Sequence, residues 1–170
     1  MNEFLDFINT RRSIRKYKQG EISEEQIKQI LEAGMQAPSA RNQQPWHFIV
    51  VKDKEIIEKI IEAHPNASMA KQASFGILVC GDLNLETAEG MWIQDCSAAT
   101  QNILLAVHAL NLGAVWTGVY PREERMEGFK KLFDLSENII PFSFIPIGYP
   151  DEKSSKADRF KKERIHYDKW

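Results

Sequence analysis

One long apolar stretch, from Met91 to Leu112, restricts how the rest of this chain can fold. Its apolar residues fall on nearly all sides of the helix that the stretch predicts, so most of that helix must be buried. The alanines that keep the helix slim are Ala98, Ala99, Ala106 and Ala109. We therefore expect a central helix that packs closely against a sheet or a partner helix and that ends at Gly113.

Shorter patterns on both sides of this stretch alternate between helix and strand. Ser23 with Gln26 matches a capping box, and Asp53 can cap the next helix, because apolar residues recur at helical spacing after both. We predict helices over residues 3–11, from Ser23 toward Pro38, from Asp53 to Ile61 and over 122–133. Buried strands are predicted over 46–51 and 75–80, and further strands over 114–120 and 142–148. No strand precedes a glycine-rich phosphate turn. The expected fold is therefore α+β, with a mixed, mainly antiparallel central sheet surrounded by helices.

The length and charge of the chain limit the classes of protein to which it can belong. Its 170 residues fit one domain, residues 1–170, in which residues 151–170 form a polar, lysine-rich C-terminal arm. The apolar fraction of 43% can supply a core without disulfides or a structural metal. Because 22 basic and 24 acidic side chains nearly cancel, a disordered chain and a generally basic nucleic-acid-binding protein are both disfavoured.

Other features favour a cytoplasmic protein without a membrane segment. No apolar run reaches the roughly 20 residues that a membrane helix needs. The first twelve residues mix acids with apolar residues and carry their arginines last, which reverses the order of a secretory signal. Cys80 and Cys96 lie among apolar or small residues and provide no disulfide framework. The histidines have no metal-ligand spacing, so we expect no metal site.

Basic residues gather at both ends of the chain. The first group follows the first predicted helix and contains Arg11, Arg12, Ser13 and Arg15, with Lys16 and Lys18 behind. Guanidinium groups bind phosphate oxygens through paired, charge-assisted hydrogen bonds, although a solvated basic loop is the simpler alternative. The second group contains Lys153, Lys156, Arg159, Lys161, Lys162 and Arg164. If the two ends meet, they form an anion site.

A polar loop precedes the strand predicted at residues 46–51. Its residues are Pro38, Ser39, Asn42, Gln44, Pro45 and Trp46. Prolines stiffen such a loop, and the polar side chains offer the donors and acceptors that recognise the edge of a polar heterocycle. The alternative is a structured connection without a ligand.

A glycine interrupts the strand predicted at residues 114–120. Gly118, next to Thr117, would let a ligand approach the backbone closely and would expose a main-chain N–H. A β-bulge is the more ordinary explanation of a glycine at this position.

Four segments in order resemble the nitroreductase family of FMN-dependent oxidoreductases. They are RRSIRKY, PSARNQQPWHFIV, WTGVYP, and FIPIGYP followed by a basic tail. The resemblance covers nearly the whole chain, which is similar to the shorter members of that family. It implies a homodimer with the C-terminal arm exchanged between subunits, and a flavin in each of two clefts built from both chains.

The resemblance also implies roles for individual residues. Arg11, Ser13 and Arg159 would hold the FMN phosphate, and Arg15 would lie beside N1 and O2 of the ring. Asn42 would bind the pyrimidine edge, Pro38 and Ser39 would cover the ring from the partner subunit, and Gly118 would present its N–H to N5 and O4. The implied cofactor-binding residues are Arg11, Arg12, Ser13, Arg15, Pro38, Ser39, Asn42, Thr117, Gly118 and Arg159. The family often has a second cation where this chain has Ala157, so Lys156 is a weaker candidate for the phosphate.

The implied activity needs no catalytic side chain, because the flavin carries the chemistry. NADH or NADPH would reduce FMN, and hydride would pass through N5 to a nitroaromatic, a quinone or a similar small acceptor in ping-pong fashion. Trp92 and Tyr120 are candidates for the acceptor pocket. The alternatives are a flavin reductase, a reductive dehalogenase or flavin-fragmenting relative, and a non-catalytic FMN-binding protein.

Overall fold

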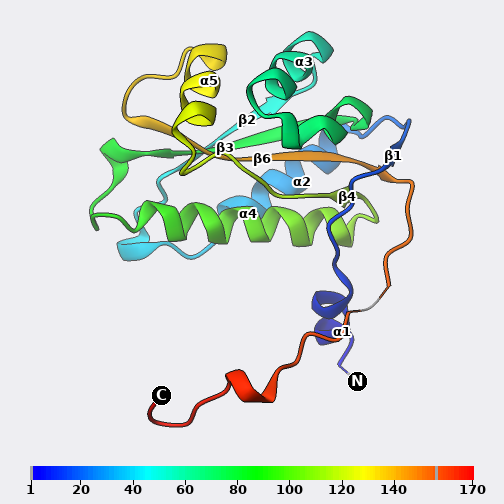
Figure 1. The fold of residues 1–170 in the computed structure, drawn as a ribbon, viewed down its shortest axis with the longest axis vertical. Coiled ribbons are helices and arrows are strands. Elements are labelled where there is room, and N and C mark those ends of the chain that lie inside the picture. Colours follow the sequence, from blue (N-terminus) through cyan, green and yellow to red (C-terminus); the bar gives the residue numbers. More distant parts are fainter. Residues whose placement is uncertain (1, 156) are drawn as a thin grey trace.

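An antiparallel sheet forms the centre of the molecule in the computed structural model, which describes residues 2–155 and 157–170 (Figure 1). Its strands β1 (Tyr17–Lys18), β6 (Ile139–Pro150), β3 (Phe75–Asp82) and β2 (Trp46–Val51) lie in that order. Two short strands, β4 (Gly113–Ala114) and β5 (Thr117–Gly118), also pair with β6. Every strand pair among the described residues is antiparallel. The predicted α+β class is confirmed.

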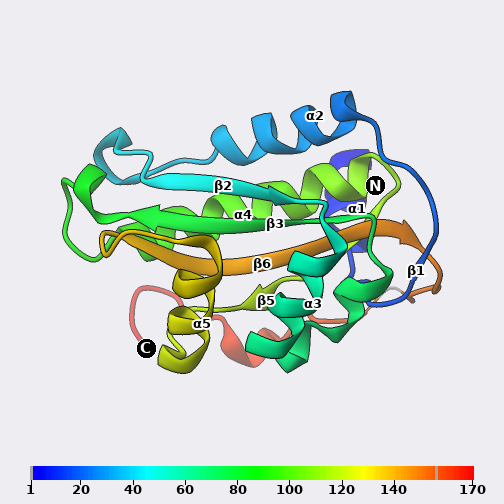
Figure 2. The same cartoon turned by 90° about the horizontal axis from the view of Figure 1, so that it is seen from above.

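Helices cover both faces of the sheet (Figures 1 and 2). Helices α2 (Glu24–Met35) and α4 (Trp92–Ala109) lie on one face, and α3 (Lys54–Ala63) and α5 (Glu123–Phe133) lie on the other. The central strand β3 sends Ile77 and Val79 into the core with α2 and α4, and Leu78 and Cys80 into the core with α3 and α5. Burial on both faces explains why β3 is apolar at successive positions.

The predicted capping residues are confirmed. The Ser23 side chain accepts a hydrogen bond from the Gln26 backbone N–H, and the Gln26 side chain accepts one from the Ser23 N–H. Asp53 caps α3 by accepting from the N–H groups of Glu55 and Ile56. These local bonds satisfy the first donors of each helix.

The long apolar stretch does form the central helix, but it ends earlier than predicted. Helix α4 stops at Ala109, and Asn111 has the left-handed backbone conformation (φ 57°) that follows a helix end. Asn is one of the residues that tolerate this conformation. Gly113 lies instead in β4, where an added Cβ would stand 2.7 Å from the side chain of Ile14.

Two strand predictions also need correction. The segment predicted as one strand over 114–120 forms β4 and β5, with Val115 and Trp116 between them. The strand predicted as buried at 46–51 is the edge of the sheet, and its His47 is exposed. An apolar run alone does not distinguish an edge strand from an interior strand, because it does not say which strands lie beside it.

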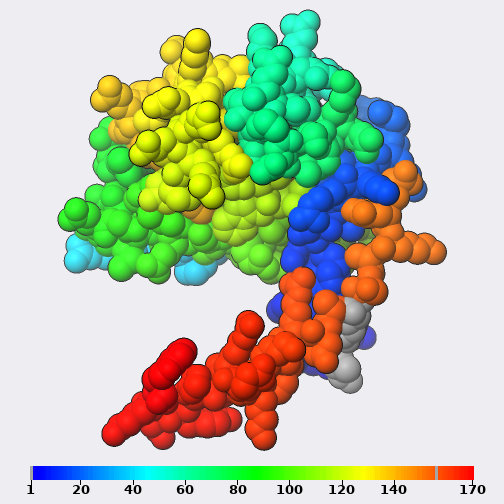
Figure 3. All heavy atoms as spheres, in the orientation of Figure 1, coloured from blue at the N-terminus to red at the C-terminus, as the bar shows by residue number. Residues whose placement is uncertain are grey.

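Both ends of the chain project together from one side of the body (Figure 3). Helix α1 (Glu3–Thr10) has no buried residue, and its apolar side chains Phe4, Leu5 and Ile8 are exposed. The C-terminal arm is exposed at every described position beyond Glu152, and it carries Phe160 and Tyr167 with 72% and 83% of their surface accessible. No helix among the described residues is both long and apolar enough to cross a membrane.

Candidate functional site

The two basic ends of the chain meet beside α1. Arg11, Arg12 and Arg159 line a hollow of about 340 Å³ between the end of α1 and the C-terminal arm. Partial burial, and then the charges of Arg159 and Arg12, lower the pKa of Arg11. Three guanidinium groups and one carboxylate, that of Asp158, line the hollow, so its formal charge is positive. The hollow therefore favours an anion. Lys156, the weaker candidate, lies outside the described residues.

Arg12 has a structural role at this hollow. Its Nη1 donates to the carbonyls of Asn9 and Arg11, at 2.8 and 2.6 Å, and its Nε donates to the carbonyl of Ser155 at 3.1 Å. These bonds fasten the arm to the end of α1. Its Nη2 is buried and has no hydrogen-bond partner among the described residues. An unpartnered buried donor is costly, and a phosphate oxygen would satisfy it.

The segment after Arg12 runs from α1 to the sheet. The Ile14 N–H donates to the Ala114 carbonyl at 2.9 Å, which holds this segment along β4. The Arg15 N–H donates to Glu152 Oε1 at 2.5 Å, and the Arg15 side chain is exposed. Its guanidinium makes no hydrogen bond or ion pair within the described part of the chain, so it is available to a ligand. Ser13 is half-buried and lies between Arg12 and Ile14, which are both held by hydrogen bonds.

Gly118 lies at the end of β5, beside an irregularity in the sheet. The N–H groups of Val119 and Tyr120 both donate to the Phe142 carbonyl, each at 3.0 Å, so two residues face one as in a β-bulge. A Cβ on Gly118 would come no closer than 3.8 Å to the atoms around it. Crowding within the chain therefore does not require glycine here, and the space beside its backbone is open.

Thr117 points away from that open space. Its side chain is buried, and its hydroxyl donates to the Phe144 carbonyl at 2.6 Å. As a candidate cofactor residue, Thr117 could contribute only through its main chain.

The polar loop of Pro38, Ser39 and Asn42 lies at the other end of α4. It is bonded to Asp95 in the first turn of that helix, whereas Thr10 beside the basic hollow is bonded to His108 in the last turn. Thirteen residues of helix separate the two places by roughly 20 Å. One chain therefore brings together the basic residues but does not bring the polar loop to them.

The two acceptor-pocket candidates lie side by side. The rings of Trp92 and Tyr120 meet edge to face, with their centroids 5.0 Å apart. Both line a hollow of about 350 Å³ with Leu83, Met126 and Ile140. Trp92 is only 6% exposed, so its ring supports this hollow more than it opens into it.

Comparison with known proteins decides the family. A profile described as Nitroreductase family matches residues 8–80 and 63–149. The chain belongs to the nitroreductase family. A Methanothermobacter thermautotrophicus protein whose name includes NADH dehydrogenase and NAD(P)H nitroreductase is 55% identical over 168 residues, covering 99% of this chain and 88% of that protein. The FMN reductase (NAD(P)H) of Bacillus subtilis is 30% identical over 188 residues, covering 98% of this chain and 74% of that enzyme.

A solved structure agrees with this placement in the nitroreductase family. A Desulfovibrio desulfuricans protein crystallised in complex with FMN superposes with a TM-score of 0.87 and is 32% identical, and the match covers 100% of this chain and 99% of that one. The predicted family is thus confirmed along nearly the whole chain.

Two residues that shape the polar loop of this nitroreductase-family chain were not predicted from the sequence. Asp95 is 4% exposed, and its carboxylate binds Ala40 and Gln43 in the loop. The signal was an acid within the otherwise apolar stretch of α4, since buried acids are rare unless paired. Gln43 carried no signal, because it stands among several polar residues of the same loop.

Proposed function

We propose that this chain is an FMN-dependent oxidoreductase that takes electrons from NADH or NADPH and passes them to a small acceptor such as a nitroaromatic or a quinone. The observation that carries the proposal is the hollow of Arg11, Arg12 and Arg159, with its unpartnered Arg12 Nη2. Membership of the nitroreductase family, the FMN reductase of B. subtilis and the FMN complex from D. desulfuricans support the same cofactor.

The residues at the hollow fit a phosphate monoester. Guanidinium groups of Arg11 and Arg159 approach from two segments far apart in the sequence, and Arg12 Nη2 supplies a further donor. The Ser13 hydroxyl can complete the set. Because Arg11, Ser13 and Arg159 would enclose the phosphate, FAD should bind poorly, since its adenylate would have no exit.

The ring of FMN would lie along the segment that follows the phosphate residues. Bound there, FMN would supply a hydride acceptor and donor at N5. The exposed Arg15 would place a cation beside the N1 and O2 edge, where two-electron reduction adds negative charge. The open space beside Gly118 would allow close approach to the main chain. Asn42, with Pro38 and Ser39, would hold the ring from the polar loop.

A second copy of the chain is part of this proposal. The polar loop and the basic hollow lie at opposite ends of α4, roughly 20 Å apart, so one chain alone does not supply both halves of the site. Helix α1 and the C-terminal arm also expose large apolar side chains, such as Phe4 and Phe160. Exposed apolar surface of this extent is typical of an interface. We therefore propose a homodimer with two shared sites.

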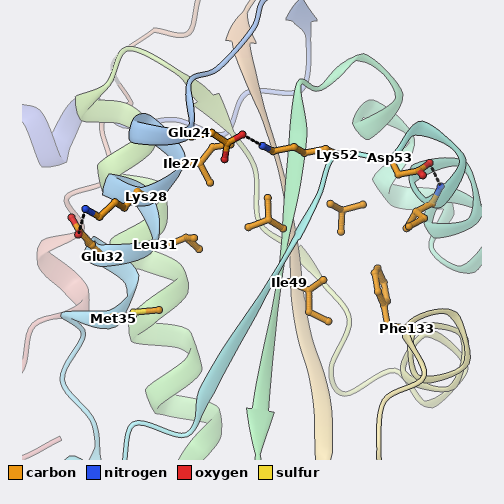
Figure 4. A pocket seen from close by; sticks show the side chains of 13 residues that line it. Glu24, Ile27, Lys28, Leu31, Glu32, Met35, Ile49, Lys52, Asp53 and Phe133 are labelled. Atoms are coloured by element: carbon orange, nitrogen blue, oxygen red, sulfur yellow. Dashed lines mark hydrogen bonds and ion pairs between the residues drawn. The ribbon is translucent and has the colours of Figure 1, made fainter.

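The body of each subunit has a groove that could bind the C-terminal arm of its partner. The free edge of β2 lies in a groove of about 780 Å³ between α2 and Phe133, with Ile27, Leu31 and Ile49 among its apolar lining residues (Figure 4). On its rim Glu24 pairs with Lys52 and Glu32 pairs with Lys28, while Asp53 caps α3. The apolar side chains of the arm match the apolar lining of the groove, and an unpaired strand edge is a ready site for an extended segment. We propose that the arm is exchanged into this groove.

Purification and anaerobic reduction test the function. The protein should be yellow with one FMN per subunit, and NADH or NADPH should bleach the bound flavin in a stopped-flow experiment. Free FMN belongs in the acceptor panel with nitroaromatics and quinones, because the FMN reductase of B. subtilis is a relative. A flavin that neither nucleotide reduces would favour the binding-protein alternative, and a colourless protein without affinity for FMN would overturn the proposal.

Two further proposals concern the chain as a whole. We propose that residues 1–170 act as one domain whose C-terminal arm serves the partner subunit. We also propose a cytoplasmic location, which is supported by the thiols of Cys80 and Cys96, both buried and unpaired. Burial raises the pKa of Cys80 to about 12 and that of Cys96 further, so neither thiol is reactive.

A further inference from the structure

A buried carboxylate holds the polar loop to the central helix. Asp95, in the first turn of α4, is 4% exposed. Its Oδ1 accepts the backbone N–H of Ala40 at 2.9 Å, and its Oδ2 accepts Nε2–H of Gln43 at 2.6 Å. Ala40 adjoins Ser39 and Gln43 adjoins Asn42, so one side chain fixes the neighbours of two proposed flavin residues.

Gln43 passes this restraint to a second loop. Its Oε1 accepts the backbone N–H groups of Thr87 and Ala88, at 2.8 and 3.0 Å. Its amide is therefore held in one orientation, with NH₂ toward the carboxylate of Asp95 and oxygen toward the two N–H groups. The chain of bonds runs from α4 through Gln43 to the loop before α4, and each donor in it meets an acceptor.

The loop that these bonds hold has an unfavourable backbone. Arg41, Asn42 and Gln44 have φ angles of 51°, 55° and 45°, all in the left-handed region. Residues other than glycine adopt this region at a cost, and a cluster of them persists only where surrounding contacts impose it. The Ser39 hydroxyl accepts the Gln44 N–H at 3.0 Å, and the Arg41 Nη1 donates to the Thr87 carbonyl at 2.7 Å. The conformation that presents Asn42 thus depends on contacts of Ser39 and Arg41 as well as on those of Asp95 and Gln43.

We propose that Asp95 is a positioning residue that, through Ala40 and Gln43, sets the conformation in which Ser39 and Asn42 meet the flavin. The inference rests on the proposed function, because it assigns these two residues to an FMN site. Asp95 itself is 4% exposed and bonded to the loop, so the role proposed for it is indirect. Its effect on the flavin is carried entirely by the loop.

The direction of the bonds makes the inference testable with nearly isosteric substitutions. In Asp95→Asn, the new NH₂ group must face either the Ala40 N–H or the NH₂ group of Gln43. If the Gln43 amide turns over to avoid this, its NH₂ group faces the N–H groups of Thr87 and Ala88. Each arrangement opposes two donors. Gln43→Glu alone sets two carboxylates against each other. In the double variant, the new amide at position 95 can donate to the new carboxylate at position 43, which still accepts from Thr87 and Ala88, and the total charge equals that of wild type.

The experiment compares full-length wild type, the two single variants, the double variant and the control Asp134→Asn. Asp134 is exposed at the end of α5, so its substitution makes the same change in charge away from the loop. We measure FMN dissociation constants, the visible circular dichroism of bound flavin and the two-electron potential. Each single variant should raise the dissociation constant about tenfold, as expected for loss of a charge-assisted hydrogen bond. The double variant should return to within about threefold of wild type, with its spectrum and potential restored.

The outcomes separate this inference from the proposed function. If wild type does not bind FMN, the proposed function fails, and the role of Asp95 toward a flavin fails with it. If wild type binds FMN and Asp95→Asn has the same affinity, spectrum and potential, only the inference is overturned. Additive losses in the double variant would also overturn it. If a single variant does not fold, a folded double variant that binds FMN supports the inference, and one that fails to fold overturns it.

Discussion

The imidazole of His108 on α4 stacks on the phenyl ring of Phe7 on α1, with the ring centroids 4.8 Å apart. The Nε2 of the same imidazole lies 3.2 Å from the Thr10 hydroxyl. That hydroxyl donates to the Phe7 carbonyl, so it accepts from Nε2–H of a neutral His108. His108 thus forms a contact between α4 and α1, at the end of the helix that leads into the basic segment.

This contact predicts a loss of stability in acid. Burial, and then the charges of Arg11 and Arg12, lower the pKa of His108. Near the unfolded pKa of about 6.5, the folded chain therefore binds fewer protons than the unfolded chain. The free energy of unfolding that depends on neutral His108 is present above that pH and is lost as the pH falls below it. Denaturant titrations at pH 7.5 and 5.5 should show a smaller acid loss in His108→Gln than in wild type. Equal losses would contradict the assignment. His64, whose pKa burial also lowers, contributes equally to both proteins.

Replacement of Arg11 tests the phosphate site. Arg11→Ala should weaken FMN binding by roughly 1.5 to 3 kcal/mol, because it removes hydrogen bonds between charged groups. Fluorescence titration of the FMN-free protein measures the change. Arg122→Ala, at an exposed position before α5, is the control and should leave affinity unchanged. Wild-type affinity in Arg11→Ala would remove this residue from the phosphate site.

Arg15 should affect the potential more than the affinity. A cation beside N1 favours the reduced flavin, so Arg15→Ala should lower the two-electron potential of the flavin. An ionic hydrogen bond is worth ~1.5 to 3 kcal/mol, and about 30 mV corresponds to ~1.4 kcal/mol. The expected decrease is therefore tens of millivolts. FMN should remain partly bound through Arg11 and Ser13. Potentiometric titration and anaerobic reduction by NAD(P)H provide the measurements, and equal potentials with equal rates would exclude Arg15 from the mechanism.

Truncation separates the two roles of the C-terminal arm. Removal of residues 151–170 should weaken both the dimer and FMN retention, because the arm supplies interface contacts as well as Arg159. A chain that ends at Arg164 keeps Arg159 and loses Ile165, Tyr167 and Trp170, so it should weaken the dimer more than the phosphate contact. Sedimentation velocity and FMN titration measure the two effects.

A substitution on the groove tests the same arrangement from the other side. Ile49→Lys, on β2 in the groove, should weaken the dimer as removal of the arm residues does. A full-length monomer that still holds FMN tightly would contradict the two-chain site.

Local signals in the sequence determined most elements of this fold. The capping residues Ser23 and Asp53 act on N–H groups within three residues of themselves, so neighbouring sequence is sufficient to predict them. The apolar stretch of α4 and the run at β3 were predicted for a similar reason, because burial on all sides leaves few polar positions. The ordered motifs and the two basic groups indicated the family and the candidate site residues.

Only the tertiary structure decided how these pieces act together. Asp95 and Gln43 are 52 positions apart in the chain and meet only because α4 lies beside the polar loop. The side chain of Thr117 points inward because β5 pairs with β6. Strand β2 is an edge strand because, among the described residues, it pairs with β3 and with no other strand. The separation of the basic hollow from the polar loop along α4 is likewise a property of packing. Contacts between distant segments depend on the whole fold, and a local pattern does not contain them.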